Sequence, residues 1–178
     1  MFSQLFDDLL NLARFRVKPL GEYRHPAWQL ALLVTVMGVF SAAVSEDFEA
    51  PLLVKIGFFV FFEWITLLLL NTFFSWWLRQ GDNWQGNESL WPLLVLANGV
   101  NLLTPVIAWF DAPFDAVVAM GLAIYSVVIL INALTQATQV RRAHVIGGVL
   151  LFTPMAFILY VLVMVVASGF GWIPDVRN

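Results

Sequence analysis

The stretch that decides the fold class is residues 52–78, which read LLVKIGFFVFFEWITLLLLNTFFSWWL. A helix that crosses a bilayer needs about 20 mostly apolar residues, and Lys55 and Glu63 are the charged residues in this stretch. At 1.5 Å per residue the helix would be about 40 Å long, so we expect it to tilt or to project beyond the hydrocarbon. The stretch therefore predicts a transmembrane helix.

Four other apolar segments have a suitable length, at residues 27–44, 90–110, 114–134 and 144–170. Hydrophobic residues make up 61% of the 178-residue chain and charged residues 12%. A soluble domain is about half apolar and about a quarter charged, and a disordered chain needs the opposite composition. We therefore expect an all-α, polytopic membrane protein whose domain at 27–173 is a five-helix transmembrane bundle.

The basic residues indicate how the bundle is oriented. Seven of the nine Lys and Arg residues fall on one side of the five spans: Arg14, Arg16, Lys18, Arg24, Arg79, Arg141 and Arg142. The other side has Lys55 and Arg177, together with Glu46, Asp47, Glu49, Asp111, Asp115 and Asp175. Basic residues are retained in the cytoplasm. We therefore expect a bacterial inner-membrane protein with a cytoplasmic N-terminus and a short external tail at 174–178.

Residues 1–26 are predicted to form a cytoplasmic amphipathic helix and a linker. At 100° per residue, one side of this helix is apolar and the other carries Asp7, Asp8 and Arg14. The apolar side consists of Phe2, Leu5, Phe6, Leu9, Leu10, Leu12 and Ala13. We expect the helix to lie on the cytoplasmic leaflet, with anionic headgroups near Arg14, Arg16, Lys18 and Arg24. The alternative is a helix that packs against the bundle.

Glu63 is the most informative polar residue, because it falls about 16 Å into its span. A carboxyl group at this depth is expected to be neutral or paired and to face protein or water. One interpretation is a group that handles a proton or a substrate. The other is a protonated or hydrogen-bonded side chain that fixes helix packing.

Amide side chains form a second polar group in the cytoplasmic halves of the spans. They are Asn71, Asn98, Asn101, Asn132, Gln136 and Gln139. The predicted topology places them at a similar depth on one side of the membrane. They would either hydrogen-bond between helices or line a shallow vestibule. The candidate binding site consists of Glu63, Asn71, Asn98, Asn101, Asn132 and Gln136.

Two of the predicted spans contain a proline away from their ends, and each of these prolines follows a threonine: Thr104-Pro105 and Thr153-Pro154. A proline frees a carbonyl one turn earlier and kinks its helix, and the threonine hydroxyl can compensate. Small residues predict close helix packing at Gly38 and Ala42, and also along Ala112, Ala116, Ala119 and Ala123.

The chain lacks the signatures of the common enzyme classes. It has no cysteine, no serine nucleophile elbow, no HExxH metal motif and no Gly-rich phosphate loop. We therefore expect no enzyme activity, catalytic residue, metal site or cofactor. The net charge of −3 argues against a nucleic-acid partner.

The layout resembles the Yip1 domain family, particularly its small prokaryotic members. The resemblance covers most of the chain, with a short N-terminal helix before prolines, five spans and an outward C-terminus. It also includes the stretch Leu96-Ala97-Asn98-Gly99-Val100-Asn101-Leu102-Leu103-Thr104-Pro105 and the connection Thr135-Gln136-Ala137-Thr138-Gln139-Val140-Arg141-Arg142-Ala143. The resemblance implies a scaffold or accessory protein that acts within membranes.

Two functional hypotheses follow. The first is a non-enzymatic membrane scaffold whose partners are the lipid bilayer and either itself or another membrane protein. The alternative is a small transporter or channel that uses Glu63 and the amide cluster along an internal path. A cavity that reaches Glu63 would favour transport, whereas Glu63 bonded to a neighbouring helix would favour the scaffold.

Overall fold

The computed structural model describes residues 2–45, 48–81, 84 and 86–173, and every regular element in these ranges is a helix. The predicted tail at 174–178, with Asp175 and Arg177, lies outside the described residues, as do Glu46 and Asp47. The five predicted spans are present: α2 (Ala27–Val44), α3 (Leu52–Leu78), α4 with η2 (Trp91–Ala97 and Asn98–Trp109), α5 (Phe114–Thr138) and α6 (Arg142–Gly169). The all-helical, membrane-spanning fold class is confirmed.

Local chemistry explains where the spans begin and end. Pro26 and Pro51 occupy the N-cap positions of α2 and α3, where the absence of an N–H has no consequence for the helix. α5 continues past the predicted end at residue 134 and stops at Thr138. Gln139 follows in the left-handed conformation, with φ 58°, which terminates the helix.

The third span is irregular; a kink at Pro105 was predicted, but a change of helix type was not. It begins as α4 and changes at Asn98 into the 3₁₀ helix η2, which contains Pro105. A 3₁₀ helix rises about 2.0 Å per residue, so η2 makes a short span longer than an α-helix would. The hydroxyl of Thr104 donates to the carbonyl of Asn101, the group that Pro105 would leave unpaired in an α-helix (2.7 Å). The predicted threonine compensation is therefore confirmed at Pro105.

Pro154 has a smaller effect on the backbone. α6 is continuous from Arg142 to Gly169 with Pro154 inside it. The hydroxyl of Thr153 donates to the carbonyl of Val149 (2.8 Å), one residue before the carbonyl of Leu150 that the proline frees. The threonine is therefore bonded within its own helix, but it does not replace the lost bond.

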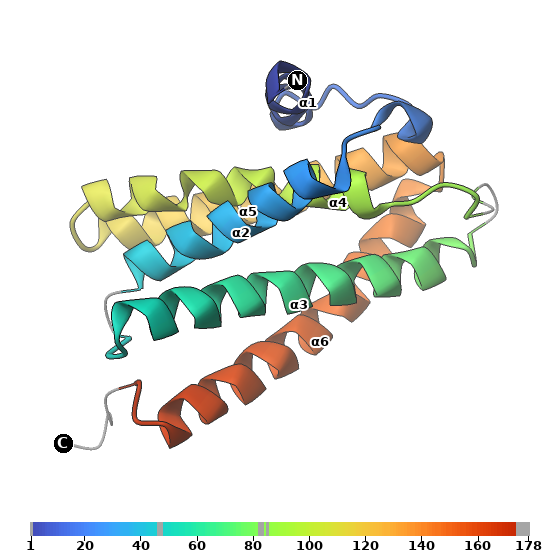
Figure 1. Ribbon diagram of the computed structural model, residues 1–178. Helices are drawn as coiled ribbons and strands as arrows, with labels where there is room; N and C mark the ends of the chain where they lie inside the picture. The colour runs from blue at the N-terminus through green and yellow to red at the C-terminus, as the bar shows by residue number, and fades with distance from the viewer. Residues whose placement is uncertain (1, 46–47, 82–83, 85, 174–178) are drawn as a thin grey trace.

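The spans form two groups, which Figure 1 shows one above the other. α2 packs against η2, and η2 packs against α5, whereas α3 packs against α6. The two groups meet where α2 contacts α3 and where α5 contacts α6. The core between them is lined by large apolar side chains such as Val34, Met37, Leu67 and Phe74, each at most 1% exposed.

α5 and α6 diverge from their connection. The buried residues of α5 all lie in its second half, from Ile129 to Thr138, and most buried residues of α6 lie near its start, such as Val145 and Gly148. Figure 1 shows α6 crossing the bundle obliquely, away from the first half of α5. The bundle is therefore tight at one end and open at the other.

Candidate functional site

The N-terminal helix α1 (Phe2–Ala13) is packed against the bundle, which was the alternative to a helix held by lipid alone. It contacts α4 and α5, and Figure 1 views it nearly end-on, so that it runs across the spans. Leu5 and Leu12 are buried, and Leu9 lies against Gly99. Phe6, predicted on the same apolar side, is 61% exposed. The predicted apolar side is therefore divided between protein contact and exposure.

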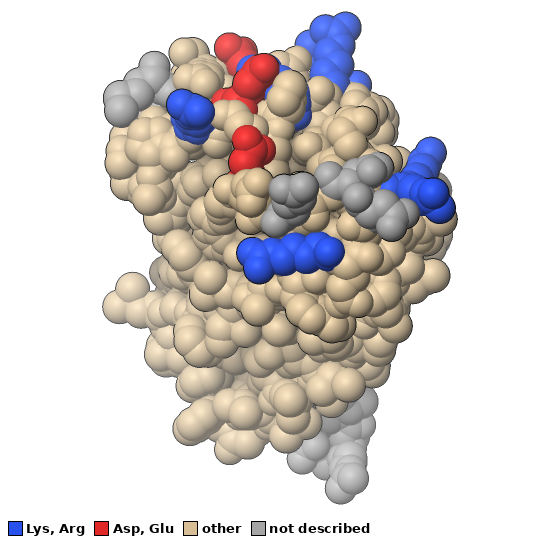
Figure 2. Space-filling view, turned by 90° about the vertical axis from the view of Figure 1, so that its right-hand side faces the viewer, with Lys and Arg blue, Asp and Glu red and all other residues tan. Residues whose placement is uncertain are grey.

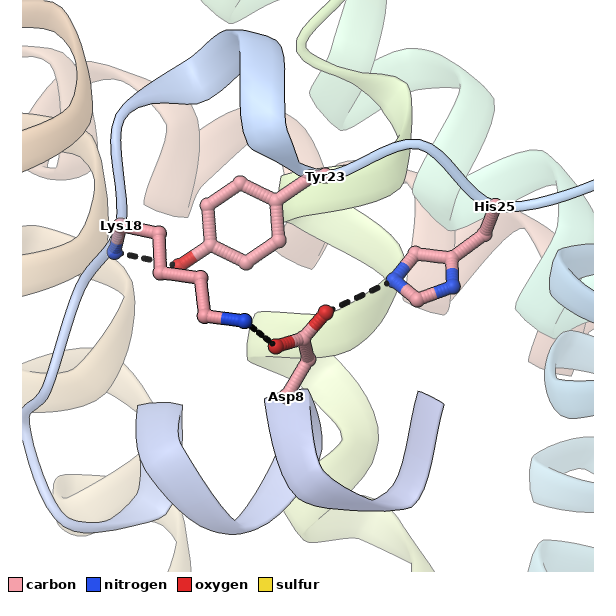
Figure 3. A network of polar contacts seen from close by, with 4 residues as sticks. All are labelled: Asp8, Lys18, Tyr23 and His25. Carbon is pink, nitrogen blue, oxygen red and sulfur yellow. Dashed lines mark hydrogen bonds and ion pairs between the residues drawn. The ribbon is translucent and has the colours of Figure 1, made fainter. Parts of the chain in front are cut away.

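Asp8 corrects the predicted polar side of α1, because it is completely buried. Its Oδ1 accepts a hydrogen bond from Nζ of Lys18 (2.6 Å), and its Oδ2 accepts one from Nε2 of His25 (3.0 Å). The side chain of His25 is also buried, at 1% exposed. Figure 3 shows how the linker folds back over α1 to bring these groups together.

A tyrosine completes this polar cluster, which we call the Asp8 cluster (Asp8, Lys18, Tyr23 and His25). The phenol oxygen of Tyr23 accepts a hydrogen bond from the backbone N–H of Lys18 (3.0 Å). The turn η1 (Leu20–Glu22) reverses the linker, so that Tyr23 returns beside Lys18. Leu20 and Tyr23 are buried, at 6% and 3% exposed, which anchors the turn.

The cluster changes the acidity of two of its members. The hydrogen bond to Asp8, aided by the negative charge of that carboxylate, raises the pKa of Lys18 above its usual value, although partial burial opposes this. Burial raises the pKa of Tyr23, because the phenolate would lose its hydration. The cluster therefore holds a cationic Lys18 beside a neutral Tyr23 at physiological pH.

The end of α1 is attached to α5. Phe15 adopts the left-handed conformation (φ 60°), and the N–H of Arg16 donates to the carbonyl of Asn11 (2.7 Å), which closes the helix. The hydroxyl of Tyr125 donates to the carbonyl of Ala13, and the rings of Phe15 and Tyr125 meet edge to face at 5.8 Å. These contacts hold α1 nearly halfway along α5, about 20 Å from Thr138 at 1.5 Å per residue.

The predicted headgroup residues do not share one environment. Arg14, Arg16 and Arg24 are exposed, and Nε of Arg24 donates to the carbonyl of Gly21 (3.0 Å). Lys18 is partly exposed and pairs with the buried Asp8. Figure 2 looks at the end where α3 stops and α6 starts, and Lys and Arg side chains are spread over it with some acidic ones among them. Headgroup contact stays a prediction for all four residues.

Glu63 lies on α3, half-buried, and the polar partner that the structure gives it is the side chain of Asn101 on η2. This contact joins two of the predicted site residues across two spans. It matches the arrangement expected for a side chain that fixes helix packing. The role of Glu63 stays a prediction.

The remaining amides bond in separate places. Nδ2 of Asn98 donates to the carbonyl of Leu94 in its own span (2.9 Å). Nδ2 of Asn132 donates to the carbonyl of Phe15 (3.4 Å), and Oδ1 of Asn132 accepts from Nε2 of Gln136 (2.9 Å). Oδ1 of Asn71 is buried without a hydrogen-bond partner. The hydrogen bonds within the described ranges therefore do not connect the six predicted residues into one network.

The sequence reasoning missed two polar features of the same end. Gln29 is 2% exposed, and neither its amide oxygen nor its nitrogen has a partner. The rings of His144 and Trp77 stack, with their centroids 4.7 Å apart. The indole N–H of Trp77 donates to the carbonyl of His144 (2.9 Å), and Nε2 of His144 contacts the carbonyl of Trp77 (3.0 Å). Gln29 was overlooked because it lies in the first turn of its span, where amides are common.

The open end of the bundle contains a cavity of about 910 Å³. Its walls come from the ends of α2 and η2, the start of α5, and parts of α3 and α6. Most of the described lining side chains are apolar, and the acidic residues among them are Asp111 and Asp115. On α3 the described lining includes Phe59, one helical turn before Glu63. Over the ranges that the structure describes, no group of three or more His, Asp or Glu residues is arranged for a metal ion.

No protein-family model, curated protein or solved structure matches this chain. The function must therefore be argued from the chain itself.

Proposed function

We propose that this protein is a non-enzymatic accessory protein of a bacterial inner membrane that acts by helix–helix association. Its partner would be a second copy or another membrane protein, as the resemblance to the Yip1 domain family implies. Five apolar spans support the membrane location. The distribution of small residues supports the mode of action.

The chain has two small-residue faces, and the structure uses one of them internally. On α2, Ala42 is buried, and Gly38 lies so close to α3 that an added Cβ would be 2.5 Å from Cα of Val60. On α5, Ala116 and Ala123 are exposed, meaning that the rest of the chain does not cover them, and Ala119 is half-covered. Ala112, predicted on the same face, precedes α5 and is also exposed. Small residues let helices approach closely in lipid, where association depends on packing. The exposed face of α5 is the observation that carries the proposal.

The experiment enlarges this face and measures association in a membrane. Ala116→Leu and Ala123→Leu should reduce energy transfer between labelled copies in vesicles, or co-purification of a partner, because leucine keeps the backbones apart. Gly121→Leu is the matched control: it lies about 140° around α5 from Ala116 and has open space around a Cβ. Equal association for all three variants would refute this use of α5.

We also propose that the N-terminus is cytoplasmic and that α1 lies in the inner interface of the membrane. The exposed Phe6, Arg14 and Arg16 support this location, because an interfacial helix combines an apolar face with basic side chains. α1 meets α5 well before Thr138, so the last turns of α5 would project from the hydrocarbon. Reporter fusions at the two ends test the orientation: both reporters in one compartment would contradict it.

A further inference from the structure

The cavity at the open end of the bundle has the size and the lining of a ligand site. Its volume of about 910 Å³ lies within the range of small-molecule pockets, about 300–1,000 Å³. It lies between spans of a membrane-embedded bundle, at the end opposite to α1 and the Asp8 cluster. Molecules that reach it from the bilayer are lipids.

The deep wall of the cavity is apolar and aromatic. Phe48 and Phe59 are nearly completely buried there, and their rings meet at 5.3 Å. Tyr160 and Met164 of α6 also line the cavity, where α6 has diverged from α5. Such a surface accommodates an acyl chain, because both are apolar and the chain can pack against the side chains.

The rim of the cavity is acidic. Asp111 follows the end of η2, and Asp115 lies in the first turn of α5, so both lie where the spans reach the membrane boundary. Oδ1 of Asp115 accepts the N–H of Ala116 (2.7 Å), which holds this carboxyl group at the start of α5. Two carboxylates beside an apolar pocket complement an ammonium group that is attached to an apolar chain.

A basic group stands beside the same rim. Nζ of Lys55 donates to the carbonyl of Ser45, and Ser45 lines the cavity. The described lining therefore includes two carboxylates, and an ammonium group is bonded to one of the lining residues. A zwitterionic aminophospholipid has the matching charges, because its phosphate is negative and its amine is positive.

We propose that this cavity binds one acyl chain of phosphatidylethanolamine, with the lipid ammonium at Asp111 and Asp115. Phosphatidylglycerol has similar acyl chains but no amine, so it serves as the comparison ligand. The inference depends on the cavity and not on α5 association, and it holds for either orientation in the membrane.

The test is native mass spectrometry of the purified full chain, titrated with equal amounts of the two lipids in detergent. The unmodified protein should retain phosphatidylethanolamine about fivefold better than phosphatidylglycerol, as expected for an ion pair near a surface. The double variant Asp111→Asn, Asp115→Asn should lose this preference and keep the acyl-chain binding. Glu49→Gln is the control: Glu49 is an exposed carboxylate of the same end outside the described lining, and its removal should change nothing.

Two further variants test the cavity itself. Met164→Trp and Ala108→Phe each fill it from a different helix, and each should lower the retention of both lipids severalfold. Using both separates an effect on the cavity from a folding defect in one variant. The proposal is overturned if the unmodified protein shows no lipid preference, if Glu49→Gln removes it as the double variant does, or if neither filling variant reduces retention.

Discussion

Gly38 of α2 lies against the backbone of Val60 of α3, so closely that a Cβ at position 38 would be 2.5 Å from Cα and 2.9 Å from the nitrogen of Val60. The obstacle is main chain, which cannot rotate away as a side-chain terminus can. The contact joins the two groups of spans, and glycine is therefore required here for close approach and not for backbone conformation.

Gly38→Ala should destabilise the bundle. Forcing extra atoms into a packed contact costs about 1–3 kcal/mol, because α2 and α3 must move apart. Unfolding in mixed micelles followed by circular dichroism measures the loss. Gly121→Ala is the control, since nothing lies within 4 Å of its Cβ, and it should be neutral or slightly stabilising. Equal stability of the two variants would show that α2 and α3 are not in this close contact.

Asp8→Asn should release α1 from the bundle. Asparagine removes the charge that holds both Lys18 and His25, and the loss of such charge-assisted hydrogen bonds costs about 1–3 kcal/mol, because the Lys18 side chain is partly exposed to solvent. Because the chain has no cysteine, Leu12→Cys, at a position 1% exposed, provides a unique reporter whose reaction with a maleimide should accelerate. Asp7→Asn removes an exposed charge and should leave the reaction slow. A slow reaction in both variants would contradict the role of the cluster.

The attachment of α1 should weaken at high pH. The folded-state pKa values of Lys18 and Tyr23 are both raised above their usual values of 10.5 and 10.0. Protonated Lys18 and Tyr23 therefore contribute fully to the stability of the attached α1 below their usual pKa values. This contribution is lost as the pH rises through their raised folded-state pKa values. The same Leu12→Cys reporter should react faster above about pH 10.5, and the increase should exceed the one that ionisation of the thiol alone produces. In an Asp8→Asn background the part of this acceleration that comes from Lys18 should disappear, whereas the part from Tyr23, whose pKa is raised mainly by burial, should remain. An unchanged acceleration would contradict the role of Lys18.

Leu5 and Phe6 should respond differently to the same substitution. Leu5→Ser removes a side chain that is buried against the bundle, so it should expose Leu12→Cys to the label. Phe6→Ser changes an exposed side chain and should leave that reporter protected. In brominated-lipid vesicles, a tryptophan at position 6 should be quenched if α1 lies in the interface. Absence of quenching would place this face of α1 in water.

Glu63→Gln tests the transporter alternative. Glutamine keeps the shape and the hydrogen bond to Asn101 but cannot carry a proton. Any proton-coupled flux through reconstituted vesicles should therefore be abolished, while the unfolding transition stays unchanged. Unchanged flux would remove Glu63 from a transport mechanism. Asn101→Leu should lower stability if the contact between α3 and η2 fixes packing.

The sequence predicted the spans well, because their signals are local. Apolar length defines a span, and Pro26 and Pro51 mark two helix starts, so the bounds of α2 and α3 agree with the predicted ranges. The change from α4 to η2 at Asn98 was not predicted. The residues there are compatible with either helix type, and the surrounding contacts select one.

The candidate site was less predictable, because pairing depends on distant parts of the chain. Asn101 was expected among the other amides, yet it faces Glu63, whereas Asn132 contacts the carbonyl of Phe15. Amides have donors and acceptors that suit many partners, so their depth in a span does not specify which one they meet.

Asp8 illustrates the division between local and tertiary information. The predicted helical wheel put Asp8 on the polar side, away from Leu5 and Leu12, yet all three side chains are buried. The wheel carries no information about the linker that covers Asp8. The amino-acid sequence by itself determined that this chain crosses a membrane in five helices, because apolar length and charge distribution are properties of each segment. Only the tertiary structure decided that Asp8 is buried, since the return of the linker through η1 brings Lys18 and His25 to one carboxylate.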